Sequence, residues 1–288
     1  MDSQTGRLGS SVRRLLTGVL LLSLIFVACR KPDNCDIALA GSTSVEPFAE
    51  RLAELYIASL RAAGARRKAE RVPEINVQGG GSSAGIRAVQ NGICQIGMSS
   101  RALTPSEKGL VEFPIALDGI VVIVNRANPI AALTIAQVRD VFAGRVKKWR
   151  ELGGRARRIT VISREDGSGT RASFEEKVMT GEAREPEPVS PDALIQDSNG
   201  AVREIVASDP DAIGYISFGL VDDRVRALTL DGVAPSESSI RAHTYPVVRK
   251  FLFLTADEPS GLTREFINYT LSDSGQSVLV EEGLTRVQ

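Results

Sequence analysis

Residues 74–101 have the sequence EINVQGGGSSAGIRAVQNGICQIGMSSR, and they hold the strongest signal for the fold class. A strand pattern at 74–77 is followed by a glycine-rich turn, a short helix pattern at 86–90 and a second strand pattern at 93–98. A strand, a helix and a strand in this order form the βαβ unit, whose two strands lie parallel. The segment therefore predicts an α/β fold built on a parallel sheet.

The same alternation continues on both sides of this segment. The continuous apolar runs at 120–124 and 251–254 are typical of strands buried on both faces. Further strands are predicted at 36–40, 159–162, 213–217 and 226–230, and helices from Val45 to Tyr56, near 104–107, and at 135–143, 172–179, 201–207, 263–271 and 274–282. The elements form two α/β blocks, one of which lies between the two apolar runs.

Composition excludes several classes of protein. The 288 residues include 35 basic and 35 acidic residues, so the balanced charge argues against a nucleic-acid-binding protein. A hydrophobic content of 43% is that of a folded globular protein. A single His excludes a His-rich metal site, and the three Cys lack zinc-finger spacing. No metal, cofactor or catalytic centre is predicted, and the protein is expected to be a monomer and not an enzyme.

The N-terminus has the layout of a secretory signal. Three arginines precede an apolar run at 15–28, which is shorter than the roughly 20 residues of a membrane-spanning helix. The segment LIFVAC (24–29) resembles a bacterial lipobox, although Phe26 stands where Leu is usual. We expect residues 1–28 to be a lipoprotein signal, Cys29 to carry the lipid and 29–35 to be a tether. The alternatives are a plainly cleaved signal, or a core helix that contains a cysteine.

Removal of residues 1–28 would change the charge and leave two cysteines besides Cys29. The processed chain would carry 32 basic and 34 acidic residues, a net charge of −2. Cys35 and Cys94 could pair in an oxidising compartment. Cys94 lies in an apolar run, so a buried thiol is the favoured alternative.

Four short turns, each at a predicted strand end, concentrate the groups that could bind an anion. They are GSTS at 41–44, GGGSSAG at 79–85, SSR at 99–101 and REDGSGT at 164–170. Hydroxyl groups and free backbone N–H groups at helix starts donate to oxyanions, and glycines let the backbone approach a ligand. The guanidinium of Arg164 can bind two oxygens of one anion. Ordinary helix capping would explain any one turn alone. Four turns at the carboxyl ends of strands in two blocks predict a ligand cleft between the blocks.

The motifs GSTSV (41–45), GSSAGI (81–86), IGMSSR (96–101), LDGI (117–120) and REDGSGT (164–170) occur in a familiar order. Together with IGYI (213–216) and LSDSGQ (271–276), they resemble the phosphate-binding proteins of bacterial phosphate ABC transporters over nearly all of 36–288. The resemblance implies a type II periplasmic-binding-protein fold, with two α/β domains joined by crossover strands and a ligand cleft between them. Residues 36–118 and 246–288 would form domain I, and 119–245 domain II.

The resemblance also implies a function. The protein would bind inorganic phosphate outside the cytoplasm, anchored by lipid on the periplasmic side or the cell surface, and deliver it to the permease subunits of an ABC importer. The crossover strands would be the hinge region. By motif position, the implied phosphate-binding residues are Ser42, Thr43, Ser44, Ser82, Ser83, Ser100, Arg101, Arg164, Ser168, Gly169 and Thr170.

One position departs from part of the family. Some members have an Asp where Ser100 stands, and that Asp accepts the proton that hydrogen phosphate retains. We expect Asp118 to be the acceptor here, because a fixed acceptor favours phosphate over fully deprotonated sulfate. The alternative is that Asp118 is an ion-pair partner of an arginine at the domain junction, such as Arg164 or Arg101.

The sequence also fits other functions. The protein could bind another tetrahedral oxyanion, be a phosphate-sensing domain, or be a phosphatase on this fold. GSSAG (81–85) also matches the G-x-S-x-G pattern of serine hydrolases, which would use Ser83 as nucleophile and His243 as base. No phosphate-binding loop of the nucleotide-hydrolase type is present.

Overall fold

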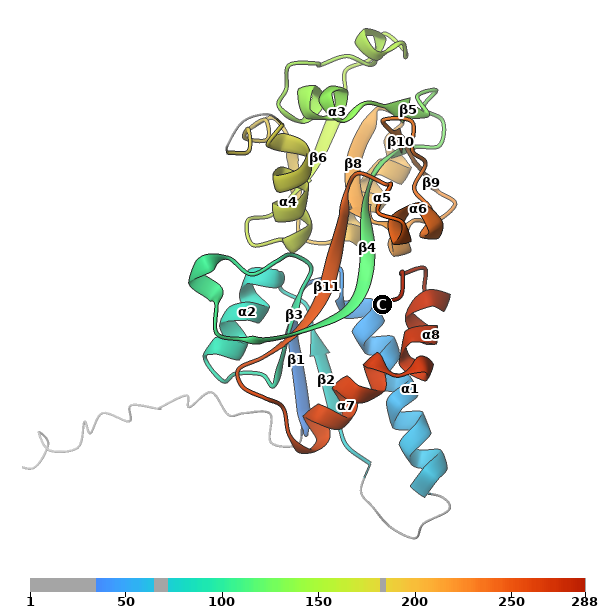
Figure 1. The fold of residues 1–288 in the computed structure, drawn as a ribbon. Coiled ribbons are helices and arrows are strands. Elements are labelled where there is room, and N and C mark those ends of the chain that lie inside the picture. Colours follow the sequence, from blue (N-terminus) through green and yellow to red (C-terminus); the bar gives the residue numbers. More distant parts are fainter. Residues whose placement is uncertain (1–34, 65–71, 182–184, 288) are drawn as a thin grey trace, which may run out of the picture. The chain divides into compact units, whose positions relative to one another are not determined.

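The computed structural model describes residues 35–64, 72–181 and 185–287, and residues from Cys35 onward form one compact unit (Figure 1). The predicted signal and Cys29 lie outside the described residues. The helices are α1 (Glu46–Gly64), α2 (Ser82–Gln90), α3 (Ile135–Phe142), α4 (Gly169–Phe174), α5 (Asn199–Ser208), α6 (Glu237–Arg241), α7 (Gly261–Leu271) and α8 (Asp273–Glu281). No described helix has the length and apolar character needed to cross a bilayer.

The described residues form eleven strands, nine in one main sheet and two in a separate small sheet. They are β1 (Ile37–Gly41), β2 (Ile75–Gln78), β3 (Ile96–Ser99), β4 (Val111–Asn125), β5 (Ala132–Leu133), β6 (Thr160–Arg164), β7 (Leu194–Gln196), β8 (Ala212–Ser217), β9 (Val225–Ala227), β10 (Thr229–Leu230) and β11 (Val248–Thr255). The order is β2-β1-β3-β11-β4-β8-β6-β7, with β9 also pairing with β4, and β5 pairs separately with β10.

The predicted parallel arrangement is confirmed at both ends of the sheet and wrong in its middle. The β2-β1-β3 and β8-β6-β7 pairs are parallel. In contrast, β11 is antiparallel to both β3 and β4, and β4 is antiparallel to β8. The reason is the path of the chain: β4 leaves the first block and β11 returns to it, so the two strands run in opposite directions (Figure 1).

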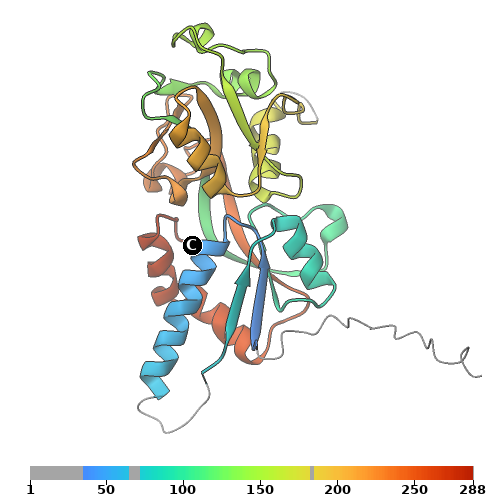
Figure 2. The same cartoon turned by 180° about the vertical axis from the view of Figure 1, so that it is seen from behind.

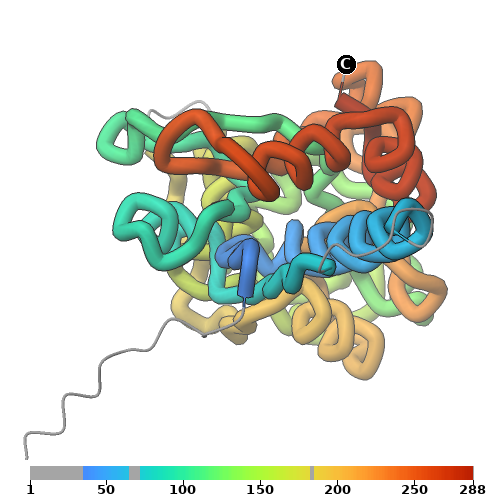
Figure 3. The backbone as a smooth tube through the Cα atoms, turned by 90° about the horizontal axis from the view of Figure 1, so that it is seen from below, coloured from blue at the N-terminus to red at the C-terminus, as the bar shows by residue number. Residues whose placement is uncertain are grey.

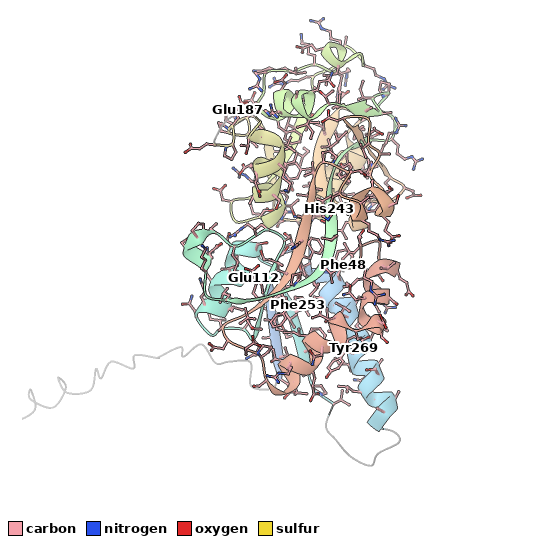
Figure 4. All side chains as sticks on the ribbon, viewed as in Figure 1. Phe48, Glu112, Glu187, His243, Phe253 and Tyr269 are labelled. Atoms are coloured by element: carbon pink, nitrogen blue, oxygen red, sulfur yellow. The ribbon has the colours of Figure 1, made fainter. Side chains whose placement is uncertain are left out.

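Buried side chains form two main clusters, one on each side of the sheet's middle. The first cluster joins α1, α7 and α8 to β1, β3 and β11 and includes Phe48 and Phe253, with Tyr269 packed against it (Figure 4). The second joins β4, β6 and β8 to helices α3–α5 and includes Trp149 and a stacked Phe174–Tyr215 pair. We call β1–β3, α1, α2, α7 and α8 the first lobe, and α3–α6 with β5–β10 the second lobe.

The two lobes share the strands β4 and β11. Side chains of β4 from Ile115 and Ala116 lie in the first cluster, and those from Ile120 to Val124 lie in the second. In the first lobe, α1, α7 and α8 cover one face of the sheet, and α2 covers the other (Figures 2 and 3). The domain boundaries predicted at 118/119 and 245/246 stay predictions.

Several elements differ from their predicted extents for local reasons. Helix α2 begins at Ser82, four residues before the predicted start, because Gly81 (φ 90°) caps it and its first turn lacks apolar residues. The capping box at Thr104 leads only into a short 3₁₀ helix, Pro105–Glu107. The elements β5, β7 and α6 have two to five residues and were not predicted, because they are too short for a periodic signal.

The two described cysteines are free thiols. Cys94 is buried, and burial raises the pKa of its thiol to about 11. The favoured expectation of a buried thiol is therefore confirmed for Cys94.

Candidate functional site

The four predicted turns lie together at the carboxyl ends of β1, β2, β3 and β6. Three belong to the first lobe and the fourth to the second, as expected for a site between two α/β blocks. Gly41 shows why the first turn needs glycine: its φ is 138°, and a Cβ there would lie 2.3 Å from the Met98 carbonyl oxygen. The close approach brings the first and third turns side by side.

Three buried serines connect the turns of the first lobe. Ser42 Oγ donates to Ser100 Oγ at 2.8 Å, and Ser82 Oγ lies 3.3 Å from the same atom. The backbone N–H of Ser100 donates to Ser82 Oγ at 3.0 Å. All three side chains are at most 1% exposed. The structure therefore brings these three predicted ligands into one hydroxyl cluster.

The fourth turn meets this cluster from the second lobe. Ser44 Oγ and Thr170 Oγ1 lie 2.7 Å apart, and Ser83 N–H donates to the Gly167 carbonyl at 3.2 Å. A Cβ at Gly169 would lie 2.2 Å from Ser82 Oγ, so the start of α4 touches the first lobe at this point. Ser168 caps α4 by accepting from the Arg171 N–H. The structure thus shows the two lobes in contact across the predicted site.

Arg164 is 1% exposed and is held from several sides. Its Nε and Nη2 donate to the two carboxylate oxygens of Glu165 at 2.9 and 3.0 Å. Nη2 also donates to Thr43 Oγ1 at 3.0 Å, and the carbonyls of Gln196 and Asp197 accept further bonds. Nη1 is buried without a partner among the described residues. A buried guanidinium with one free edge is suited to an anion.

A second buried arginine, Arg249, was not predicted. Its Nε donates to Asp118 Oδ2 at 2.8 Å, and its Nη1 donates to Thr170 Oγ1 at 2.9 Å and to the Ser100 carbonyl at 3.3 Å. Its Nη2, like Nη1 of Arg164, is buried without a partner in the described part of the chain. The available sequence signal was weak: Arg249 stands two residues before the apolar run at 251–254, and only the observed start of β11 at Val248 places it inside a buried strand, where a charge needs a partner.

Asp118 has partners on both carboxylate oxygens. Oδ1 accepts from Ser217 Oγ at 2.7 Å and from the Phe218 N–H at 3.2 Å, and Oδ2 accepts from Arg249. Burial raises the pKa of Asp118, while Arg249 and Ser217 act in the opposite direction. The alternative, an ion pair with an arginine at the domain junction, is therefore formed, but the arginine is Arg249 and neither Arg164 nor Arg101. Arg249, 131 residues away, is the partner because β4 and β11 pair at these two positions. The role of Asp118 as proton acceptor stays a prediction.

The side chain of Arg101 makes its described hydrogen bonds within the first part of the chain, before β4. Its Nη1 and Nη2 each donate to one carboxylate oxygen of Glu107 at 2.7 Å, and Nη2 also donates to Ser83 Oγ at 3.1 Å. The hydrogen bond from Arg101 holds the pKa of Glu107 at about 2. Arg101 therefore positions Ser83, and the structure gives it no bond to Asp118.

Asn199 is a further residue that sequence patterns did not single out. It is 1% exposed at the start of α5, and its Nδ2 donates to Ser44 Oγ at 2.9 Å. Its Oδ1 accepts from the Ser217 N–H at 3.2 Å. Asn199 thus joins the first turn to the second lobe, although an Asn beginning a helix looks like an ordinary cap in the sequence.

The nucleophile–base pair of a serine hydrolase is not formed. Ser83 Oγ accepts from Arg101, and no hydrogen bond among the described residues joins it to His243. His243 lies beside β4 and β11 in a groove that Pro114 and Lys250 also line (Figure 4). No described cluster of three or more His, Cys, Asp or Glu side chains could hold a metal ion. The converging groups are hydroxyls, N–H groups and two guanidiniums, which suit an oxyanion.

Comparisons with known proteins agree with this chemistry. The family model described as "PBP superfamily domain" matches residues 28–274. The phosphate-binding protein PstS of Bacillus subtilis is 32% identical over 255 residues, 86% of this chain and 79% of that protein. The structure of a putative phosphate ABC transporter substrate-binding protein with bound phosphate from Clostridium perfringens is 38% identical, with a TM-score of 0.79 over 88% of this chain and 99% of that chain.

The structure of an ABC-type phosphate transport receptor from Vibrio cholerae is 36% identical, with a TM-score of 0.71 over 88% of this chain and 100% of that chain. These likenesses confirm the predicted type II periplasmic-binding-protein fold. The chain belongs to the PBP superfamily and, within it, to the family of phosphate-binding proteins of ABC transporters.

Proposed function

We propose that the protein binds inorganic phosphate outside the cytoplasm and delivers it to the permease of an ABC importer. The observation that supports this most strongly is a pair of buried guanidiniums, Arg164 and Arg249, each with an unpartnered edge in the described structure. Each donates to a hydroxyl of the four turns, Arg164 to Thr43 Oγ1 and Arg249 to Thr170 Oγ1. A tetrahedral dianion would supply acceptors to these donors and balance their charge.

The proposed phosphate ligands come from both lobes. The first lobe contributes Ser42, Thr43, Ser44, Ser82 and Ser100, with Ser83 and Arg101 beside them. The second lobe contributes Arg164, Ser168, Gly169 and Thr170, and Asp118 stands behind Arg249 at their junction. Closure of the lobes would replace the water around phosphate by these fixed donors, so the ligand favours the closed form by the contacts that only that form supplies.

Calorimetric titration with phosphate, sulfate and molybdate tests the proposal. Phosphate is expected to bind more tightly than either competitor at equal ionic strength. Equal affinity for sulfate would instead support a receptor for tetrahedral oxyanions in general. That alternative has one specific observation behind it, because Ser100 and not a carboxylate lies in the hydroxyl cluster.

Membrane attachment is part of the same proposal. Cys29 would carry the lipid after removal of residues 1–28, and the receptor would act as a monomer without enzymatic activity. Cys29→Ser is expected to move the protein from the membrane fraction to the soluble extracytoplasmic fraction, as measured by fractionation and metabolic labelling with a fatty acid. Cys35→Ser is the matched control and should remain in the membrane fraction. Unchanged fatty-acid labelling of the Cys29 variant would contradict the anchor.

A further inference from the structure

Arg249 occupies a position that belongs to neither lobe alone. It lies on β11, directly opposite Asp118 on β4, in the two antiparallel strands that connect the lobes. Its side chain is 2% exposed, and that of Asp118 is 0% exposed. The pair therefore lies fully buried at the point where the chain passes from one lobe to the other.

The guanidinium of Arg249 contacts both lobes through one nitrogen. Nη1 donates to the Ser100 carbonyl, at the end of β3 in the first lobe, and to Thr170 Oγ1, in the first turn of α4 in the second lobe. Thr170 Oγ1 in turn lies 2.7 Å from Ser44 Oγ. Any separation of the lobes would break the bond to one of them.

The charges around Arg249 leave room for an anion. Each of the two buried arginines has one carboxylate partner, Asp118 for Arg249 and Glu165 for Arg164. The two guanidiniums flank the same turn, because Arg164 donates to Thr43 Oγ1 and the next residue, Ser44, bonds the Thr170 hydroxyl that accepts from Arg249. The free edges Nη1 of Arg164 and Nη2 of Arg249 are the donors left over. Two buried guanidiniums repel each other, and each is destabilised by a donor that has no acceptor. An anion between them would accept these hydrogen bonds and offset the repulsion.

We propose that Arg249 is a second anion-binding arginine, carried by the hinge strands, and that Asp118 is its positioning residue in place of the acceptor of the phosphate proton. The proposal rests on the phosphate-binding function proposed above and names two groups of that site. Asp118 fixes the plane of the guanidinium through Nε, and Ser217 Oγ and the Phe218 N–H fix the carboxylate from the second lobe. The ligand would complete the coordination of Arg249, whose Nη1 can bond to both lobes only when the lobes are together. Ligand binding and lobe closure are thereby coupled through this side chain.

The test compares the full chain with Arg249→Gln, Arg249→Lys, Asp118→Asn, the double variant Asp118→Asn/Arg249→Gln, and Arg164→Ala. Arg203→Gln is the matched control, since Arg203 is partly buried, pairs with Asp222, donates to the Leu220 carbonyl and makes no described bond to a proposed ligand residue. Dissociation constants for phosphate and for sulfate are measured by calorimetry, and thermal melts identify the variants that are folded.

Arg249→Gln is expected to weaken phosphate binding about 30-fold or more, which corresponds to loss of one buried charged contact. Arg249→Lys should not restore it, because a point charge cannot occupy the planar positions of Nε, Nη1 and Nη2 together. Asp118→Asn should weaken phosphate and sulfate by the same factor. The double variant should be no weaker than Arg249→Gln, because a positioning residue acts only through the group that it positions. Arg203→Gln should bind as the original chain does.

The role of Arg249, the role of Asp118 and the phosphate-binding function can each be overturned by a different result. If Arg249→Gln binds phosphate normally while Arg164→Ala does not, the role of Arg249 is wrong and the phosphate site stands. If Asp118→Asn changes the ratio of phosphate to sulfate affinity, and its effect adds to that of Arg249→Gln, Asp118 acts on the ligand directly. If the original chain binds no phosphate, the proposed function itself is wrong. If Arg249→Gln does not fold, normal binding by a folded Arg249→Lys variant would still overturn the claim.

Discussion

Arg164 is fully buried and its Nη1 has no partner in the described structure, so its removal should be costly if it binds the ligand as proposed. Arg164→Ala is expected to weaken phosphate binding by about 2–5 kcal/mol, since truncation of a buried charged donor leaves its partners unpaired. Calorimetry with purified protein measures this. Arg158→Ala is the control, because Arg158 is an exposed arginine that pairs with Asp192. Near-normal affinity of Arg164→Ala would remove Arg164 from the site.

Glu107 makes stability depend on acid pH. Arg101 holds its folded pKa at about 2, below the value of about 4.3 expected for an unfolded chain. The ion pair therefore stabilises the protein fully above about pH 4.3 and is lost as the pH falls toward 2. Glu107→Gln should lower the free energy of unfolding by about 1 kcal/mol near neutral pH, and less near pH 2. Urea unfolding at several pH values measures the difference, and a difference independent of pH would contradict the assignment.

Among single residues, those in glycine- and hydroxyl-rich turns could be singled out as anion-site candidates from the sequence. Residues that come together only through strand pairing could not. Ser42, Ser82, Arg164 and Thr170 lie in turns whose glycines and hydroxyls indicate an anion site without knowledge of the fold. The partner of Asp118 could not be found in this way. Arg249 is its neighbour because of the register between β4 and β11, and hydrophobic periodicity does not give that register.

Helix α4 begins where the second lobe touches the first, and Gly169 permits the contact. A Cβ at this position would lie 2.2 Å from Ser82 Oγ and 2.5 Å from Ser100 Oγ. Gly169→Ala should therefore weaken phosphate binding by about 1–3 kcal/mol, because the lobes cannot approach fully. Gly64→Ala, where the added methyl group meets open space, is the control. Calorimetry measures both variants. Unchanged affinity of Gly169→Ala would mean that the contact is not needed in the bound state.

The presence of the long helices and strands was predicted better than the direction of the strands or the residues at which elements begin and end. The helices α3, α5, α7 and α8 lie close to their predicted ranges because each has a clear apolar face, whereas α1 begins as predicted but continues eight residues past its predicted end at Tyr56. The antiparallel direction of β4 and β11 could not be read from their apolar runs, since a strand buried on both faces looks the same in either direction. The start of α2 was missed because its first turn contains serines and a glycine in place of apolar residues.

For the molecule as a whole, the proposed ligand should act as a stabiliser. The hydrogen-bond donors proposed to bind phosphate come from both lobes. They converge only in the folded chain, so phosphate binds the folded state and not the unfolded one. Phosphate at 100 times its dissociation constant should stabilise the protein by about 2.7 kcal/mol and raise the melting temperature. Sulfate at the same ionic strength should raise it less. Differential scanning calorimetry measures both, and an equal shift for the two anions would argue against selective phosphate binding.

The order of elements in the first cluster has a consequence for biosynthesis. That cluster combines side chains from Ile37 to Ala116 with side chains from Phe251 to Leu284. The residues of the second cluster, in contrast, lie in one continuous stretch from Leu117 to Val247. A chain emerging from a ribosome or a secretion channel can therefore assemble the second cluster before the first. The first lobe, which contains three of the four turns, can complete its core only after α7 and α8 have been synthesised. A prematurely terminated chain would thus lack an anion site altogether.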